Sequence, residues 1–209
     1  MKKFLKENYS YIKSIMITLL LQALIYFTLN IILKNHIILK TSFNIPLIKW
    51  MIFIYNSWYP LVFYISYLIY KDNTNLYKKL IFTMILGFLM SHITFIIYPS
   101  SIIRNDIIVN NFIDFVIYVT YKFDNPVNCL PSIHALVCYI LIYYTLKSNL
   151  SLKRKIILNI YLFLIILSTL FVHQHIPIDL LLALIYSLIS IITIKKLYPK
   201  LKETLKFLF

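Results

Sequence analysis

Glycine, cysteine and acidic residues are scarce in this chain of 209 residues. It contains one glycine, two cysteines and seven Asp or Glu residues. Two cysteines are too few for a disulfide framework, and we expect Cys129, in a predicted loop, and Cys138, inside a predicted helix, to be free thiols. With a single glycine, the apolar segments also lack the helix breaks that mark the binding sites of many transporters.

Hydrophobic residues are abundant instead, at 61% of the chain, and the mean hydropathy is +0.81. A soluble domain is nearer half apolar, so this composition indicates an integral membrane protein. The net charge of +14 would favour a nucleic-acid partner in a soluble protein. Here the basic residues flank apolar runs, where positive charge sets the topology, and we expect no nucleic acid to bind.

Six apolar runs have roughly the length needed to cross a bilayer. They cover residues 14–33, 51–70, 80–98, 132–146, 156–172 and 176–194. We therefore predict an all-α, polytopic membrane protein whose six transmembrane helices form a single domain over residues 1–209. The first run follows a basic stretch, but no small-residue cleavage site comes after it. We expect an uncleaved helix there and not a signal peptide.

The second run is the least regular, because two prolines interrupt the stretch "NIPLIKWMIFIYNSWYP". Trp50, Tyr55, Trp58 and Tyr59 in this stretch suit the headgroup level of a membrane, where Trp and Tyr are enriched. The second helix is therefore expected to begin as an interfacial segment.

The basic residues are distributed unevenly between the two sides of this six-helix arrangement. One side holds 16 of the 21, namely Lys2, Lys3, Lys6, Lys13, Lys71, Lys78, Lys79, Lys147, Lys153, Arg154, Lys155, Lys195, Lys196, Lys200, Lys202 and Lys206. The other side holds Lys34, Lys40, Lys49, Arg104 and Lys122. Because loops rich in Lys and Arg stay in the cytoplasm, we predict that both termini are cytoplasmic in a multi-pass protein of the cell membrane.

The longest loop on the predicted outer side covers residues 99–131, between the third and fourth helices. Its stretch "NDIIVNNFIDFVIYVTYKFDNP" has apolar residues at helical spacing with Asp and Asn between them. We expect this amphipathic segment to lie along the outer membrane surface. Phe112, Phe115, Val116 and Val119 are expected to form an apolar face over the polar groups nearby.

Three polar clusters fall on this outer side. "YPSSIIRND" follows the third run, "NCLPSIHALVCY" opens the fourth, and "STLFVHQHIPID" joins the fifth to the sixth. In the last cluster His175 and Asp179 are four residues apart, which places them on one face if both are helical. The carboxylate can then accept the imidazole N–H, fix its tautomer and stabilise the imidazolium.

A phosphate group suits this combination of residues. Pro131 and Pro177 fit the first turns of two helices, whose N-termini offer free N–H groups and partial positive charge. Ser132 can donate a hydrogen bond, and Arg104 can grip phosphate oxygens with its planar fork. One histidine can attack phosphorus while a second protonates the departing alkoxide, since both titrate near neutral pH. No metal or other cofactor is required if fixed donors neutralise the transferring group.

The motifs P-S-I-H at 131–134 and H-I-P-I-D at 175–179 resemble the second and third signatures of the type 2 phosphatidic acid phosphatase superfamily. Those signatures are written P-S-G-H and S-R-x5-H-x3-D. The wider forms "LPSIHA" and "QHIPID" are similar to the branch that contains inositol phosphorylceramide synthases and their bacterial relatives. Sphingomyelin synthases share the same His, His, Asp set.

This resemblance implies a six-helix fold and an outward-facing site that takes a lipid phosphate substrate from among the membrane lipids. It also implies catalysis through a phosphohistidine. By position, it makes His175 the nucleophile, Asp179 its orienting partner and His134 the acid. Ser132 becomes a phosphate ligand, and Ser168 matches the serine of the third signature.

Four positions depart from the family pattern. In the first signature, K-x6-R-P, Ile97 stands in place of the lysine and Asn105 in place of the proline. Thr169 stands where the third signature has its arginine, and Ile133 where the second has its glycine. Arg104 is therefore the best remaining cation for gripping phosphate, with Lys122 a distant second.

Other functions fit parts of the pattern. A lipid phosphatase is the first interpretation, and a lipid headgroup phosphotransferase is the second. His173 and His175 with Asp179 resemble a zinc ligand set, but two residues apart on a helix point in different directions. A transporter or proton relay would explain ionisable groups in the membrane, yet these groups cluster at one face. A catalytically inactive, lipid-binding member of the family is the remaining alternative.

Lone histidines in helical membrane proteins usually serve in packing, in a hydrogen bond to a neighbouring helix or at the interface. We expect such roles for His36, His92 and His173. The sequence predicts neither the particular lipid nor the oligomeric state.

Overall fold

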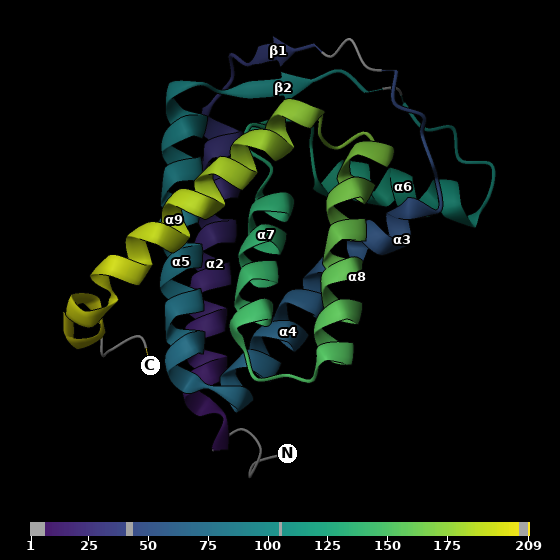
Figure 1. The fold of residues 1–209 in the computed structure, drawn as a ribbon. Helices are drawn as coiled ribbons and strands as arrows, with labels where there is room; N and C mark the ends of the chain where they lie inside the picture. Colours follow the sequence, from purple (N-terminus) through teal and green to yellow (C-terminus); the bar gives the residue numbers. More distant parts are fainter. Residues whose placement is uncertain (1–6, 41–43, 105, 205–208) are drawn as a thin grey trace.

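The computed structural model describes residues 7–40, 44–104, 106–204 and 209. Asn105 and four of the basic residues used for the topology prediction, Lys2, Lys3, Lys6 and Lys206, lie outside these ranges. The described residues form eight helices and two short strands (Figure 1). In chain order they are α2 (Tyr9–Ile32), β1 (Ile37–Leu39), α3 (Met51–Asn56), α4 (Trp58–Asp72), α5 (Thr74–Ile97), β2 (Ser100–Ile102), α6 (Phe112–Phe123), α7 (Ile133–Lys147), α8 (Leu152–Phe171) and α9 (Pro177–Thr204).

Among the described residues, four helices are long and apolar enough to cross a membrane: α2, α5, α8 and the stretch Pro177–Lys200 of α9. This agrees with the prediction of a mostly helical, multi-pass membrane protein. The prediction of six spans is not confirmed, because the remaining two candidates are shorter or interrupted. The helix α7 has 15 residues, a length of about 22 Å against about 30 Å for the hydrocarbon core.

The second expected span divides at Ser57 into α3 and α4. Pro60 accounts for the break, because it has no N–H to donate to the carbonyl of Asn56 one turn earlier. The hydroxyl of Ser57 donates to the carbonyl of Ile54 (2.6 Å), which satisfies part of the interrupted turn. The break leaves Tyr55 on α3 and Trp58 on α4 close to the same histidine, as described below.

The helix α7 lies at the centre of the bundle and packs against α4, α5, α8 and α9 (Figure 1). Most of its side chains are buried, including Leu136, Ile140 and Leu141 at 0% exposure. The single glycine, Gly87 on α5, lies where that helix meets α7, since a Cβ there would stand 3.2 Å from the side chain of Leu136. A glycine therefore permits the close approach of α5 and α7.

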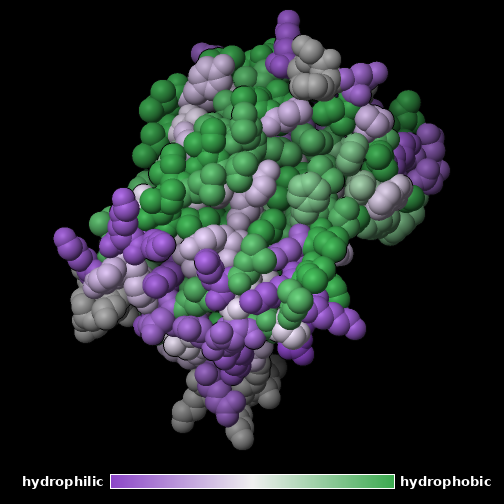
Figure 2. Space-filling model, viewed as in Figure 1, coloured by the Kyte–Doolittle hydropathy of each residue, from purple (hydrophilic) through white to green (hydrophobic). Residues whose placement is uncertain are grey.

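The two ends of the bundle differ in polarity. The start of α2 and the α4–α5 and α7–α8 connections lie at one end, whereas β1, β2 and α6 lie at the other (Figure 1). Figure 2 shows hydrophilic side chains concentrated at the first of these ends, and mostly hydrophobic side chains over the rest of the visible face. The end that carries the connections is the one predicted to be cytoplasmic, but the orientation itself stays a prediction.

The opposite end is closed by the pair β1–β2 and by α6. The strands pair in parallel, with Ile37 opposite Ser100 and Leu39 opposite Ile102. The helix α6 lies within the segment predicted to be amphipathic: Ile117 and Tyr121 are buried, whereas Phe112 and Phe115 are 70% and 51% exposed. The pattern of an apolar helix with one buried side agrees with the periodicity of the sequence.

Candidate functional site

His175 lies in the connection between α8 and α9, immediately before the first turn of α9. Its Nδ1 is 3.2 Å from Oδ2 of Asp179, which is fully buried. The same oxygen accepts the backbone N–H of Ile176 at 3.0 Å, so Asp179 also caps the start of its own helix. The predicted pairing of His175 with Asp179 is therefore present, although it uses the N-terminal turn of α9 and not two helical positions.

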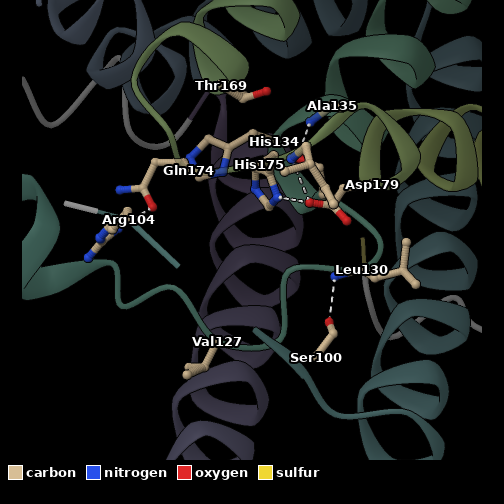
Figure 3. Close-up of polar contacts among 12 residues, drawn as sticks. Ser100, Arg104, Val127, Leu130, His134, Ala135, Thr169, Gln174, His175 and Asp179 are labelled. Atoms are coloured by element: carbon tan, nitrogen blue, oxygen red, sulfur yellow. Dashed lines mark hydrogen bonds and ion pairs between the residues drawn. The ribbon is translucent and has the colours of Figure 1, made fainter. Parts of the chain in front are cut away.

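The backbone of His175 is fixed by the end of α8. The carbonyl of Thr169 accepts the N–H groups of both Gln174 (3.0 Å) and His175 (3.1 Å). Thr169 and Ser168 direct their hydroxyls back along α8, to the carbonyls of Ile166 and Ile165. Thr169 thus holds the loop through its backbone, in the position where the family signature has an arginine (Figure 3).

His134 lies in the first turn of α7 and faces His175, with the two ring centroids 6.5 Å apart (Figure 3). Ser132 begins this helix: its hydroxyl accepts the N–H of Ala135 at 3.3 Å. The backbone N–H of Ser132 donates to the carbonyl of Asp179 at 3.2 Å. This bond joins the starts of α7 and α9, and so sets the distance between the two histidines.

The strand β2 positions the segment that leads into α7. The hydroxyl of Ser100 accepts the N–H of Leu130 at 3.0 Å, and its carbonyl accepts the N–H of Asn128 at 2.6 Å. Asn128 has a positive φ of 51°, a conformation that Asn adopts more readily than most residues. Its side chain donates to Asn30 at the end of α2 (2.5 Å). The segment that leads to His134 is therefore fixed by contacts with both β2 and α2.

Aromatic side chains enclose His134. Its ring centroid is 4.5 Å from those of both Tyr55 and Trp58, and 6.1 Å from that of Tyr59. Tyr55 and Trp58 are 0% and 7% exposed, whereas Tyr59 is about half exposed. Two residues that the sequence suggested for the headgroup level therefore form part of the site. No described residue hydrogen-bonds to Nε2 of His134.

Asp124 is a second carboxylate at the site, and it is connected to His134 through Tyr55. The Tyr55 hydroxyl donates a short hydrogen bond to Asp124 and lies 3.5 Å from Nδ1 of His134. The Tyr26 hydroxyl donates to Asp124 at 3.4 Å. Asp124 carries negative charge close to the histidine that is expected to donate a proton. Neither tyrosine was predicted as a site residue, because the contacts join helices distant in sequence.

Arg104 contacts the end of α6 and the connection between α8 and α9, beside the site. Its guanidinium donates to the side-chain oxygen of Gln174 (2.6 Å) and to the carbonyls of Asp124 (3.0 Å) and Tyr121 (2.7 Å). It also lies over the Tyr121 ring, 3.8 Å from the centroid. Burial lowers the pKa of Arg104 from its usual value, and the nearby Tyr121 and Asp124 oppose that shift.

These bonds use three of the five N–H donors of Arg104. Gln174 lies between Arg104 and His175 (Figure 3). The guanidinium is therefore near the site, as the sequence predicted, but it is largely engaged by the protein. Lys122 is exposed and lies 5.4 Å from the ring of Tyr118 on the same helix.

A cavity of about 630 Å³ leads to the two histidines. Its polar end is formed by His134, His175 and Asp124, and mostly apolar residues of α2, α4 and α6 line the rest. Val119 and Phe123 belong to this wall, so α6 covers part of the site as predicted. Phe112 and Phe115, which were expected on the same face, are exposed instead. Such a volume is typical of a pocket for a small organic ligand.

His173 does not join this group of residues. Its backbone φ is 53°, and its Nε2 contacts the carbonyl of Ile45 at 3.0 Å. Within the described part of the chain, no three His, Cys, Asp or Glu residues are grouped as metal ligands would be.

Fold and site together define a helical, multi-pass membrane protein with two histidines at the head of an apolar cavity. Residues 108–203 match the family model of the PAP2 superfamily, and the matched segment contains His134, His175, Asp179 and Asp124. The matched segment is therefore similar to this superfamily, whose members are typically phosphatases. Comparison with curated proteins gave no significant match, and neither did comparison with solved structures.

Proposed function

We propose that this protein is an integral membrane lipid phosphatase that acts through a phosphohistidine at His175. One observation carries the proposal: His175 is paired with Asp179 at 3.2 Å and faces His134, at 6.5 Å between ring centroids, at the polar end of an apolar cavity. The cavity suits the chain of a lipid, and the histidine pair suits its phosphate.

The first step forms a bond between His175 and phosphorus. Asp179 accepts a hydrogen bond from the Nδ1–H of His175, which leaves the unprotonated Nε2 as the nucleophile. As the N–P bond forms, the P–O bond to the lipid breaks, and protonated His134 gives its proton to the departing alkoxide. Tyr55 contacts Nδ1 on the other side of His134, and Asp124 contacts Tyr55, so Nε2 is the nitrogen that donates.

The second step returns the enzyme to its starting state. Water attacks the phosphohistidine, and the now neutral His134 takes a proton from that water. The N–P bond breaks, inorganic phosphate leaves, and His134 is protonated again. Burial of His134 disfavours this charged form, whereas the charge of Asp124, which Tyr55 connects to His134, favours it. The same histidine thus serves as acid and then as base.

Donors for the phosphate oxygens come from two places. The backbone N–H groups of Ile133 and His134, in the first turn of α7, make no backbone hydrogen bond within the described residues. Arg104 has two N–H donors beyond the three that the protein uses. Ser132 is fully buried and caps α7, so it reaches a phosphate only if its hydroxyl turns from Ala135. These fixed donors would neutralise the transferring group without a metal.

A lipid headgroup phosphotransferase is the second candidate, as in the inositol phosphorylceramide synthase-like branch that the motifs resemble. The largely apolar cavity favours it, because a lipid alcohol that enters there could replace water in the second step. A catalytically inactive lipid-binding protein is the third, because Thr169 provides no cation and Arg104 is largely engaged. In each case we expect a site on the outer face of the cell membrane.

The purified protein, reconstituted in lipid, tests the proposal when it is supplied with lipid phosphates with and without a lipid alcohol. We expect released phosphate to exceed transfer product. His175→Ala should abolish both turnover and the acid-labile phosphoenzyme, and Asp179→Asn should lower the rate by roughly 100-fold or more. His134→Ala should slow turnover most for poor leaving groups.

His173→Asn is the matched control, because it changes a neighbouring histidine that contacts Ile45 and not Asp179. Asn also tolerates the positive φ at that position. Turnover that persists in His175→Ala would overturn the mechanism. A dominant transfer product would favour the phosphotransferase, and lipid binding without turnover would favour the inactive alternative.

A further inference from the structure

A stripe of polar residues runs along α2. Ser14, Thr18, Gln22, Tyr26 and Asn30 recur every four residues, so each lies about one turn from the next in a stripe that winds slowly around the helix. Four of them are hydrogen-bonded: Ser14 to Tyr77, Thr18 to the carbonyl of Ser14, Tyr26 to Asp124, and Asn30 to Asn128. Gln22 is the exception, at the middle of the stripe.

The carboxamide oxygen of Gln22 is buried and has no hydrogen-bond partner within the described residues. The residue is 8% exposed and lines the cavity that leads to His134 and His175. An amide without partners in an apolar environment costs free energy, and polar residues in membrane helices usually have a function. Leucine or alanine would fill the same place at no such cost.

Trp58 contributes a second unpaired group to the same cavity. Its indole Nε1 is buried without a partner in the described part of the chain, and the residue is 7% exposed. Its ring contacts that of His134 at 4.5 Å between centroids. An N–H donor and an amide that both donates and accepts therefore line a largely apolar cavity beside the catalytic histidines.

The position of Gln22 matches the anatomy of a lipid. Gln22 is one helical turn, about 6 Å, from Tyr26, whose hydroxyl contacts Asp124 at the site. In glycerolipids and sphingolipids, a carbonyl or hydroxyl lies a few bonds from the phosphate, before the hydrocarbon chains begin. Polyprenyl phosphates carry no such group. Met16, Leu20 and Phe63 in the same cavity suit the chains themselves.

We propose that Gln22 and Trp58 form a polar subsite that hydrogen-bonds the carbonyl or hydroxyl group joining the phosphate of a lipid to its chains. The subsite selects glycerolipid or sphingolipid phosphates over polyprenyl phosphates. This assignment rests on the proposed function, because it names the substrate class of the same site. Gln22 and Trp58 bind substrate and take no part in proton or phosphoryl transfer.

Gln22→Leu, which keeps the volume and removes the amide, tests the subsite. We expect kcat/KM for phosphatidate to fall about tenfold, the effect of one lost hydrogen bond to a buried group. For a polyprenyl phosphate, kcat/KM should change by less than about twofold. Thr18→Val is the matched control, since it removes a hydroxyl of the same stripe outside the cavity. Equal losses on both substrates, or no loss on either, would overturn the subsite.

Binding of neutral lipids separates this inference from the proposed function. The shift in unfolding temperature with diacylglycerol, ceramide or polyprenol requires no turnover. Diacylglycerol or ceramide should raise the unfolding temperature of the wild type, and should raise that of Gln22→Leu and Trp58→Phe less. The lipid that gives the larger shift identifies the lipid class. If the wild type releases no phosphate but shows this pattern, the result supports the proposed subsite and contradicts the proposed phosphatase activity. The proposed subsite would be contradicted if polyprenol alone stabilised the protein, or if each lipid raised the unfolding temperature equally in all variants.

Discussion

At the scale of single residues, His134 is the most heavily surrounded group of the site. Tyr55 and Trp58 contact its ring, and Tyr55 connects its Nδ1 to Asp124. His175 has an equivalent connection to Asp179. Each histidine is thus linked at Nδ1 to a carboxylate, directly for His175 and through a hydroxyl for His134. The two Nε2 atoms remain for the reaction, which suits a nucleophile facing an acid.

Tyr55→Phe isolates the connection between His134 and Asp124, because it removes only the hydroxyl. We expect kcat to fall about tenfold, the effect of losing a hydrogen bond to a charged group. The loss should be larger for lipid phosphates with poor leaving groups, which depend most on the proton. Steady-state kinetics with a series of leaving groups measures it.

Tyr64→Phe is the control for this change, since Tyr64 lies on α4 and is 54% exposed. If Tyr55→Phe loses the same activity with every leaving group, the Tyr55 hydroxyl contributes to packing and does not support His134 as the acid. Unchanged activity would remove Asp124 from the mechanism.

The sequence predicted His134, His175 and Asp179 because short motifs contain them. The pair at 175 and 179 lies within one helical turn, so spacing alone indicates the contact. Tyr55 on α3, Asp124 at the end of α6 and Gln22 on α2 come from three other segments, and only the packing of these helices brings them to the site. No periodicity distinguishes such a tyrosine from one at the headgroup level.

At the scale of elements, α6 is attached to the rest of the molecule by an ion pair. Lys49 donates to the buried Asp114 at 2.6 Å, and Asp114 also accepts the N–H of Asn110 at 3.2 Å. The hydrogen bond from Lys49 lowers the pKa of Asp114 below its usual value. Because α6 forms part of the cavity wall through Val119 and Phe123, this ion pair supports the site.

Asp114→Asn should lower the unfolding temperature at neutral pH. The folded pKa of Asp114 lies below the unfolded value of about 3.9. Its contribution to stability is therefore present above the unfolded pKa and is lost as pH falls through the folded pKa. The difference between wild type and Asp114→Asn should shrink between neutral pH and about pH 3. Thermal unfolding at both pH values measures this.

Asp106→Asn is the control, because Asp106 is an exposed aspartate of the same loop. It should leave the unfolding temperature unchanged at both pH values. A destabilisation by Asp114→Asn that is as large at pH 3 as at pH 7 would show that the ion pair is not its cause.

The sequence predicted the long helices better than the short ones. Runs such as those of α2 and α5 are long and apolar, so composition alone identifies them. The run at 51–70 divides because Pro60 removes a single hydrogen bond, and α7 ends after 15 residues. A sliding-window hydropathy profile detects neither the break at Pro60 nor the early end of α7. The short α7 is surrounded by other helices, so packing stabilises it without the full length of a membrane span.

At the scale of the whole molecule, the polarity of the two ends sets the direction in which the site faces. The site lies near β2 and α6, at the end opposite the α7–α8 connection (Figure 1). The basic residues Lys147, Lys153 and Lys155 are near that connection. If loops rich in Lys stay in the cytoplasm, the histidines face outward, where a lipid phosphate of the outer leaflet reaches them.

Thiol labelling in intact cells tests this orientation with few complications. Cys129 and Cys138 are 2% and 0% exposed. Burial, with the charges of Asp179 and Asp124, raises the pKa of the Cys129 thiol, so it reacts poorly. Asp106→Cys should react with an impermeant thiol reagent added outside. Ser151→Cys, exposed in the α7–α8 connection, should react only after the cells are opened. The reverse pattern would place the site in the cytoplasm, and its substrate in the inner leaflet.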